Sequence, residues 1–155
     1  MSQELLNKAS QKLTLGAVFL KKSEILINDD FIGQDNLEKQ SFKGVQACRI
    51  DKIEQDDQEQ YLYKFVYSVG VRLVDTSMDD EDSGFQKALI EADFEAHYLS
   101  EIELEEDCLQ AFGEFNVGYH VWPYWREYVQ STCMRSGIVL ISIPLYKYLQ
   151  TTEQK

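Results

Sequence analysis

Two segments in the middle of the chain carry an apolar side chain at every second position. In the first, an apolar residue occupies every second position of residues 61–73, and in the second the same holds for residues 90–98. Successive side chains of a β-strand point to opposite faces, so this period of two predicts strands with one covered face. In the second segment Glu91, Asp93 and Glu95 take the other face. That pattern is typical of an antiparallel sheet with one solvated side.

Two less regular segments extend the predicted sheet to four strands. Residues 13–19 alternate in a strand that runs toward Glu24, and residues 25–27 either prolong this strand or form a short one of their own. Another strand is predicted around residues 45–50, where a bulge near Cys48 would explain a change of phase. Its apolar markers are Val45, Ala47 and Ile50.

Polar segments separate the predicted strands. Residues 28–41 contain Asp, Asn and Gly turn formers and are predicted to form a loop, and residues 56–58 form a polar turn. Residues 79–84 read Asp-Asp-Glu-Asp-Ser-Gly, which raises the question of calcium binding. An EF-hand loop needs Gly at its sixth position and Glu at its twelfth. The ligand spacing here fails that pattern, because Ile90 stands at the twelfth position counted from Asp79. The segment is therefore predicted to be a solvated hairpin tip.

Two helical segments follow the strands. Residues 102–115 carry an apolar face formed by Leu104, Cys108, Leu109, Phe112 and Phe115, with acidic residues near the amino end, where a helix dipole favours them. The longer helix is predicted over residues 123–136, because proline is tolerated at a first helical turn and Gly137 suits the position after the end. Its apolar stripe is Trp122, Trp125, Val129 and Cys133.

This order of elements resembles the SecB protein-export chaperone family. The sharpest shared motif is Pro-Tyr-X-Arg-Glu at residues 123–127, followed by Arg-X-Gly at residues 135–137 and Ser-Ile-Pro at residues 142–144. The resemblance spans roughly residues 12–150. It departs from the family pattern at Trp125, at Ser136 and in a shortened tail after Pro144.

The resemblance implies an α+β fold, with a four-stranded antiparallel sheet, a long helix packed on one face and a short C-terminal segment. Residues 1–155 are predicted to form a single domain, with residues 1–10 and 151–155 disordered. By resemblance, the segment between the fourth strand and the long helix helps to line a groove for client polypeptide.

The implied function is that of an ATP-independent holdase chaperone, which binds non-native polypeptides in an apolar groove. The predicted groove residues are Val45, Ala47, Phe112, Phe115, Tyr119 and Trp122. By resemblance the protein is a homotetramer, a dimer of dimers. Tyr124, Tyr128 and Thr132 lie on a second face of the long helix, where exposed aromatics predict a subunit interface.

Three further readings of the partner stay open. By resemblance, a SecA-type motor docks on acidic residues of the sheet, and Glu24 is the candidate here, although Lys21 and Lys22 flank it. A SecB-like chaperone dedicated to one client, such as an antitoxin, is a variant of the same function. The alternative class is a non-chaperone adaptor or scaffold on the same fold that binds one folded partner.

Composition excludes several classes of partner. The net charge is −12, from 27 acidic and 15 basic residues, which argues against nucleic acid and anionic membranes. The longest uninterrupted apolar run, residues 137–141, is too short to span a bilayer, and residues 1–10 show no signal-peptide pattern. We expect an acidic, cytoplasmic protein without membrane insertion.

The sequence also predicts neither metal nor catalysis. The three cysteines, Cys48, Cys108 and Cys133, are dispersed and form no C-x-x-C pair, which favours free thiols in a reducing cytosol. Nucleophile-elbow, P-loop and dinucleotide-binding motifs are absent. His97 is predicted to face solvent and His120 to cap or pack. We therefore expect a binding protein without a cofactor, not an enzyme.

Overall fold

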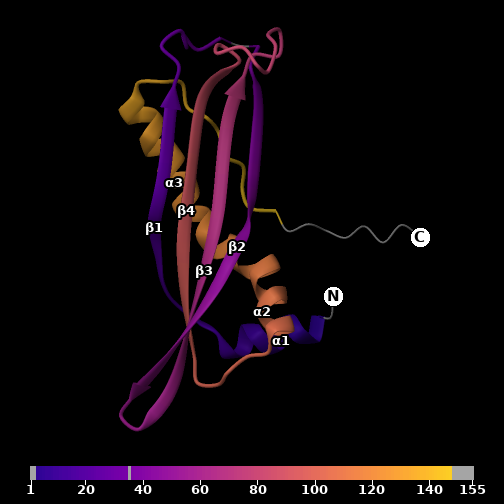
Figure 1. The fold of residues 1–155 in the computed structure, drawn as a ribbon, viewed down its shortest axis with the longest axis vertical. Helices are drawn as coiled ribbons and strands as arrows, with labels where there is room; N and C mark the ends of the chain where they lie inside the picture. The colour runs from indigo at the N-terminus through magenta and orange to yellow at the C-terminus, as the bar shows by residue number, and fades with distance from the viewer. Residues whose placement is uncertain (1–2, 35, 148–155) are drawn as a thin grey trace, which may run out of the picture.

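The computed structural model describes residues 3–34 and 36–147, and its centre is a four-stranded antiparallel sheet (Figure 1). The strands lie in the order β1-β4-β3-β2, so the last two strands of the sequence are the central ones. This confirms the predicted sheet, and residues 25–27 prolong the first strand. The strands are β1 (Thr14–Ile27), β2 (Glu38–Gln55), β3 (Gln58–Val74) and β4 (Gln86–Ser100).

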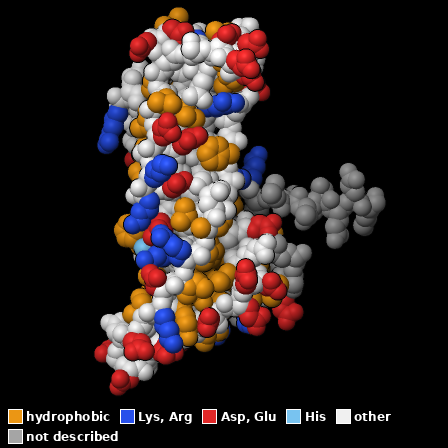
Figure 2. All heavy atoms as spheres, in the orientation of Figure 1, with side chains coloured by type: hydrophobic (Ala, Val, Ile, Leu, Met, Phe, Trp, Pro, Cys, Tyr) orange, Lys and Arg blue, Asp and Glu red, His pale blue; other side chains and the backbone are white. Residues whose placement is uncertain are grey.

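The register of the central strands gathers their apolar side chains on one face. Tyr63 pairs with Tyr98 and Tyr67 with Phe94, and all four are at most 3 % exposed. We call this covered side the helix face and the opposite side the outer face. Figure 2, in the same orientation as Figure 1, shows acidic, basic and apolar side chains interspersed over the molecule.

Strand β2 begins at Glu38, inside the stretch predicted to be a loop. Its bulge lies between Val45 and Ala47, slightly earlier than predicted. Val45 pairs with Tyr67 and so belongs to the helix face, whereas Ala47 pairs with Val66 on the outer face. A bulge shifts the phase of the strand, so the residues after it on the helix face are Cys48 and Ile50.

The helical part of the chain is longer than predicted. Helix α2 (Glu106–Phe112), the π-helical turn η1 (Gly113–Val117) and helix α3 (Gly118–Ser136) follow one another without a break. The predicted start at Pro123 is wrong, because this proline lies inside α3. Pro123 and Tyr119 are both exposed, so water can satisfy the carbonyl group that proline leaves without a donor. The predicted end is confirmed by Gly137, whose φ of 66° is left-handed.

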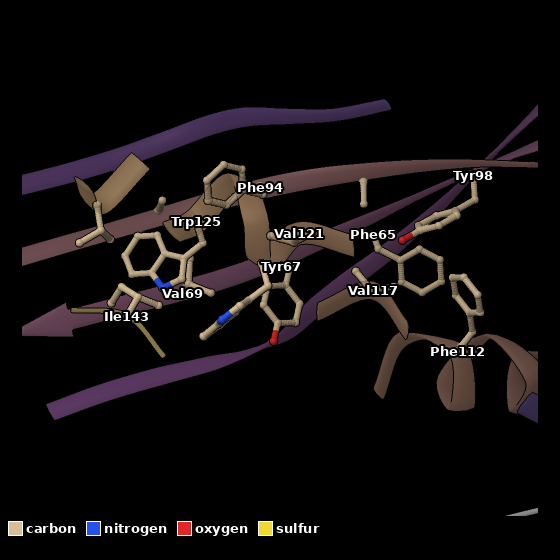
Figure 3. Packing of buried hydrophobic residues seen from close by; sticks show 14 of the residues in the cluster. Phe65, Tyr67, Val69, Phe94, Tyr98, Phe112, Val117, Val121, Trp125 and Ile143 are labelled. Carbon is tan, nitrogen blue, oxygen red and sulfur yellow. The ribbon is translucent and has the colours of Figure 1, made fainter. Parts of the chain in front are cut away.

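Helix α3 crosses the helix face obliquely and buries the predicted stripe (Figure 1). Trp125 and Val129 are at most 1 % exposed, and Figure 3 shows Trp125 and Val121 packed beside Phe94, Tyr67 and Val69. Burying an aromatic side chain of this size stabilises a fold by about 2–3 kcal/mol. The core therefore forms between the central strands and one continuous helical segment.

Residues 3–10 are helical where disorder was predicted for residues 1–10, and residues 1–2 lie outside the described residues. Helix α1 (Gln3–Lys12) packs against α2, Ala9 is fully buried and Leu13 is 8 % exposed. Leu5, Ala9 and Leu13 recur every four residues, which places them on one face of a helix. The prediction for residues 3–10 is thus wrong, and residues 151–155 lie outside the described residues. None of the described helices is long and apolar enough to cross a membrane.

Candidate functional site

An open groove of about 820 Å³ lies on the helix face, between β2 and the segment that contains α2 and η1. Its floor is formed by Phe65 and Tyr67 of β3. The wall on the strand side contains Val45, Cys48 and Ile50, and the wall on the helical side contains Leu104, Leu109 and Phe115.

Two local features hold the helical wall in place. The hydroxyl of Tyr63 accepts a hydrogen bond from the amide of Leu104 at 2.8 Å, which fixes the loop before α2. Gly113 brings η1 against the sheet, because a Cβ there would lie 3.2 Å from Phe65 and 3.5 Å from Val45. The groove is therefore bounded by parts of the core and not by mobile side chains alone.

The rim of the groove carries acidic and basic side chains. Glu103, Glu106 and Glu114 line the helical side, while Lys43 and Lys147 stand at one end. The Lys43 ammonium group lies 4.5 Å from the centre of the Tyr146 ring, a cation–π contact. An extended apolar segment with basic residues would meet carboxylates along one side of this groove.

Residues 138–147, which we call the strap, follow α3 and return over the helix face toward β2 (Figure 1). The strap contains neither helix nor strand, and it buries Ile141 and Ile143 in the core. Its last part reaches the groove, which Tyr146 and Lys147 help to line. No helix covers the groove within the described part of this C-terminal segment.

The structure brings two of the six predicted groove residues into the groove. Val45 and Phe115 line it, whereas Ala47 lies on the outer face because of the bulge. Phe112 is 2 % exposed and lies in the core (Figure 3). The centre of its ring lies 4.9 Å from that of Tyr98, in a T-shaped contact. The periodicity of residues 102–115 could not separate Phe112 from Phe115, because both positions fit one apolar face.

The other two predicted groove residues lie beyond the end formed by Tyr146. Tyr119 is 54 % exposed, and its ring centre lies 6.3 Å from that of Tyr146. Trp122 is 9 % exposed, and its Nε1–H donates to the Pro144 carbonyl of the strap at 2.7 Å. Sequence reasoning missed Cys48 and Ile50, which correct placement of the bulge would have found.

The predicted interface residues of α3 are not equally exposed. Tyr124 is 48 % exposed, but Tyr128 is half-buried with its ring edge against Phe94, and Thr132 is 5 % exposed. The helix packs against the broad face of a sheet, so its buried stripe is wider than the predicted one. In this chain only Tyr124 presents a large free surface at these three positions.

The free cysteine of the groove has an unusual environment. Cys48 is exposed, while Cys108 and Cys133 are buried. Although the residue is exposed, Cys48 lines the groove, and its partial withdrawal from water raises the pKa of the thiol to about 11. Within residues 3–34 and 36–147, no group of three or more His, Cys, Asp and Glu side chains could hold a metal ion.

The two histidines occupy opposite faces of the sheet. His97 is only 17 % exposed on the outer face, where its Nε2 lies 2.7 Å from Glu95 Oε1, so it is less exposed than predicted. On the helix face His120 Nδ1 shares a hydrogen bond of 2.8 Å with the Tyr98 hydroxyl, which agrees with a packing role. Burial lowers the pKa of His120.

The acidic candidate for motor docking lies on the outer face. Glu24 of β1 is paired in register with Glu91 of β4, and both line a shallow hollow together with Asp93 and Lys22. Docking of a SecA-type motor at Glu24 stays a prediction.

Comparisons with known proteins add a likeness in fold alone. No family model matches the chain, and no curated protein matches its sequence. Among solved structures, the chain is similar to a SecB-like chaperone of Mycobacterium tuberculosis in complex with a ChAD peptide from the HigA1 antitoxin. The TM-score is 0.69 at 13 % sequence identity, over 94 % of this chain and 98 % of that chain. The fold of this protein is therefore SecB-like.

Proposed function

We propose that this protein is a holdase chaperone that binds extended, non-native polypeptide in the groove, without ATP and without catalysis. The observation that carries the proposal is the open groove itself, whose floor and both walls are apolar on a SecB-like fold. Exposed apolar concavities of this size on a protein surface are typical of sites that bind other polypeptides.

The chemistry of the groove suits varied apolar segments. Phe115 offers an accessible aromatic ring above a floor of the nearly buried Phe65 and Tyr67, and the walls are lined by aliphatic side chains. The carboxylates of the rim and the net charge of −12 favour clients with basic stretches. These features support binding that depends on apolar side chains and charge and little on one sequence.

The client is part of the proposal and comes in two forms. The similar mycobacterial structure holds a peptide from an antitoxin, which supports a dedicated client of that kind. A general client pool for protein export, with delivery to a SecA-type motor, is the broader form. The alternative class is an adaptor or scaffold that uses the same groove for one folded partner.

We also propose a homo-oligomer, by resemblance a tetramer located in the cytoplasm. Large apolar side chains on the helix side of β1 remain exposed, among them Leu20 at 45 % and Ile25 at 42 %. Tyr124 of α3 adds another 48 % exposed side chain. A substitution of Tyr124→Glu should lower the mass of the assembly in sedimentation, whereas Gln130→Glu on the exposed side of α3 should not. A wild-type chain that sediments as a monomer at micromolar concentration would rule the oligomer out.

The test of the function uses the bulge of β2 as a built-in control. Ile50 lines the groove and is 46 % exposed, so Ile50→Glu should keep the fold and lose client binding. Ala47 is three positions away but faces the other side of the sheet, so Ala47→Glu should behave as wild type. The measurements are suppression of aggregation of a reduced, unfolded model protein, and anisotropy of a labelled apolar peptide.

The native thiol at Cys48 gives an independent readout. Maleimide labelling of Cys48 should slow when peptide fills the groove, while the buried Cys108 and Cys133 stay unlabelled as a check of the fold. If the Ile50 and Ala47 variants suppressed aggregation and bound peptide equally well, and peptide did not protect Cys48, the client site would not be this groove. A protein that suppresses no aggregation but saturates with one folded partner would favour the adaptor.

A further inference from the structure

The strap is held by side-chain donors of β2 and α3, and not by main-chain hydrogen bonds to a strand of the sheet. Among the described residues, its only main-chain hydrogen bond to main chain is that of the Ile138 amide with the Cys133 carbonyl, where α3 ends. Four side-chain donors instead reach main-chain carbonyls of the strap. They are Lys39 Nζ to Ser142 at 2.8 Å, Arg126 Nε to Ile143 at 3.1 Å, Trp122 Nε1 to Pro144 at 2.7 Å and Lys43 Nζ to Lys147 at 3.5 Å.

These contacts do not depend on which residues the strap contains. A carbonyl oxygen is present in every residue of every polypeptide, so the four donors recognise main chain in general. The side chains of Ile141 and Ile143 point into the core, while Ser142 and Pro144 between and after them are exposed. This is the pattern by which a site binds an extended peptide, with main-chain bonds for affinity and alternate side chains in pockets.

The slot beneath the strap continues the groove. Along β2 the strap is bound at Lys39 and Lys43, and the groove follows from Lys43 to Ile50. On the helical side Arg126 and Trp122 hold the strap, and the groove follows at Phe115 and Leu109. The same strand and the same continuous helical segment therefore form both halves.

We propose that the slot is the second half of the client site, and that the strap occupies it as a built-in competitor. This rests on the proposed function of the groove. A short client fills the open groove and leaves the strap in place. A longer extended client displaces residues 138–147, and its own carbonyl groups accept the hydrogen bonds of Lys39, Lys43, Trp122 and Arg126.

The strap is suited to such an exchange. It leaves three large apolar side chains exposed, at 64 % for Val139, 56 % for Leu140 and 69 % for Leu145, and buries only two isoleucines fully. Tyr146 is the side chain that links strap and groove, through a hydrogen bond with the buried Tyr67 hydroxyl. A client that fills the isoleucine pockets and the groove at once would replace all of these contacts.

Two variants loosen the strap by different routes. Ile143→Ala removes a buried anchor of the strap. Gly118→Ala places a Cβ 2.6 Å from the hydroxyls of both Tyr146 and Tyr67, so the half-buried Tyr146 must move. Val139→Ala is the matched control, because this exposed strap residue is held by none of the four donors.

The first experiment measures anisotropy of two fluorescein-labelled peptides that alternate Leu or Phe with Ser or Lys, one of eight residues and one of twenty. Both loosened variants should bind the long peptide about threefold or more tightly, because less of the client's binding energy goes into displacing the strap. The short peptide should bind wild type, Ile143→Ala and Val139→Ala equally. Gly118→Ala also moves Tyr146 in the lining of the groove, so its affinity for the long peptide is compared with its own affinity for the short one. The control variant should match wild type for both.

The second experiment observes displacement directly. In a Cys48→Ser background, Ile143→Cys places a thiol in the strap at a position where the native residue is only 9 % exposed. The long peptide should speed maleimide labelling at position 143 severalfold, the short peptide should not, and unlabelled Cys108 and Cys133 would show that the core stays closed.

The outcomes separate this inference from the function on which it rests. If wild type binds both peptides but neither loosened variant gains affinity for the long one, the strap is not a competitor and the groove proposal stands. Weaker long-peptide binding by both loosened variants would make the strap a part of the client site, which also overturns the inference. If wild type binds no peptide at all, the proposed function is wrong. The inference that the strap competes with a client is then wrong as well.

Discussion

Arg49 on β2 reaches past β3 to the carboxylate of Glu95 on β4, with 2.7 Å between Nη2 and Oε2. The Glu95 side chain is only 6 % exposed although it lies on the outer face, and His97 holds its second oxygen at 2.7 Å. Burial by itself raises the pKa of this carboxyl, but the hydrogen bonds from His97 and Arg49 outweigh burial and lower it. Strands β2 and β4 are thus tied together across β3 on the solvated side of the sheet.

Substitution of Glu95→Gln should lower the free energy of unfolding at pH 7 by about 1–3 kcal/mol, because charge-assisted hydrogen bonds to a buried carboxylate are lost. The folded pKa of Glu95 lies below its unfolded value, so its stabilisation is complete above roughly pH 4.3 and is lost as the pH falls through the folded pKa. The gap between wild type and variant in denaturant titrations should therefore close in acid.

The matched control for this prediction is Asp51→Asn. Asp51 pairs with Lys64 at 2.7 Å but is more than half exposed, so solvent screens the pair and the variant should lose little stability. An equal loss for the Asp51 and Glu95 variants would contradict the assignment to burial.

Gly70 should be sensitive to substitution only while Phe42 is present. A Cβ at Gly70 would overlap the ring of Phe42, because this ring of the neighbouring strand lies over the glycine. Gly70→Ala should therefore cost about 1 kcal/mol in the wild type. In a Phe42→Ala background the same change should stabilise by roughly 0.5–1 kcal/mol, since alanine is better than glycine inside a strand. A double-mutant cycle of unfolding free energies measures the difference, and equal effects in both backgrounds would refute the contact.

The hairpin between β2 and β3 turns through two aspartates with left-handed backbone. Asp56 has φ of 52° and Asp57 has φ of 60°, as a type I′ turn requires at both central positions. Asp57→Gly should raise the free energy of unfolding by about 0.5–1 kcal/mol, because glycine adopts this conformation without a steric penalty. Asp79→Gly, in the other hairpin loop, should not stabilise, since its φ is not positive. Chemical denaturation of both variants checks this.

Phe112 and Phe115 should separate stability from binding. Phe112→Ala should cost about 3–5 kcal/mol of folding free energy, because the ring is 2 % exposed in the core. Phe115→Ala, in the wall of the groove, should leave thermal unfolding nearly unchanged and weaken peptide binding by about 2 kcal/mol. If Phe112→Ala weakened peptide binding and Phe115→Ala lowered stability, Phe112 would belong to the groove and Phe115 to the core.

Local patterns in the sequence determined much of this fold. The alternation of residues 61–73 and 90–98 was sufficient for two long strands with a covered face, because strand periodicity is a property of the backbone. The end of α3 was equally local, since Gly137 alone among its neighbours adopts a left-handed φ without strain. The order of the predicted elements then pointed to the resemblance, and the similar solved structure shares the fold.

Tertiary structure decided which of these residues reach the groove. The β2 bulge lies between Val45 and Ala47 and not near Cys48, and this difference placed Ala47 on the outer face and Cys48 and Ile50 in the site. Phe112 and Phe115 share one predicted face, and only the contact of α2 and η1 with the sheet distinguishes the core residue from the groove residue. Periodicity gives the face of an element, but exposure depends on what packs against that face, and the strap and the ordered α1 contact partners that lie far away in the sequence.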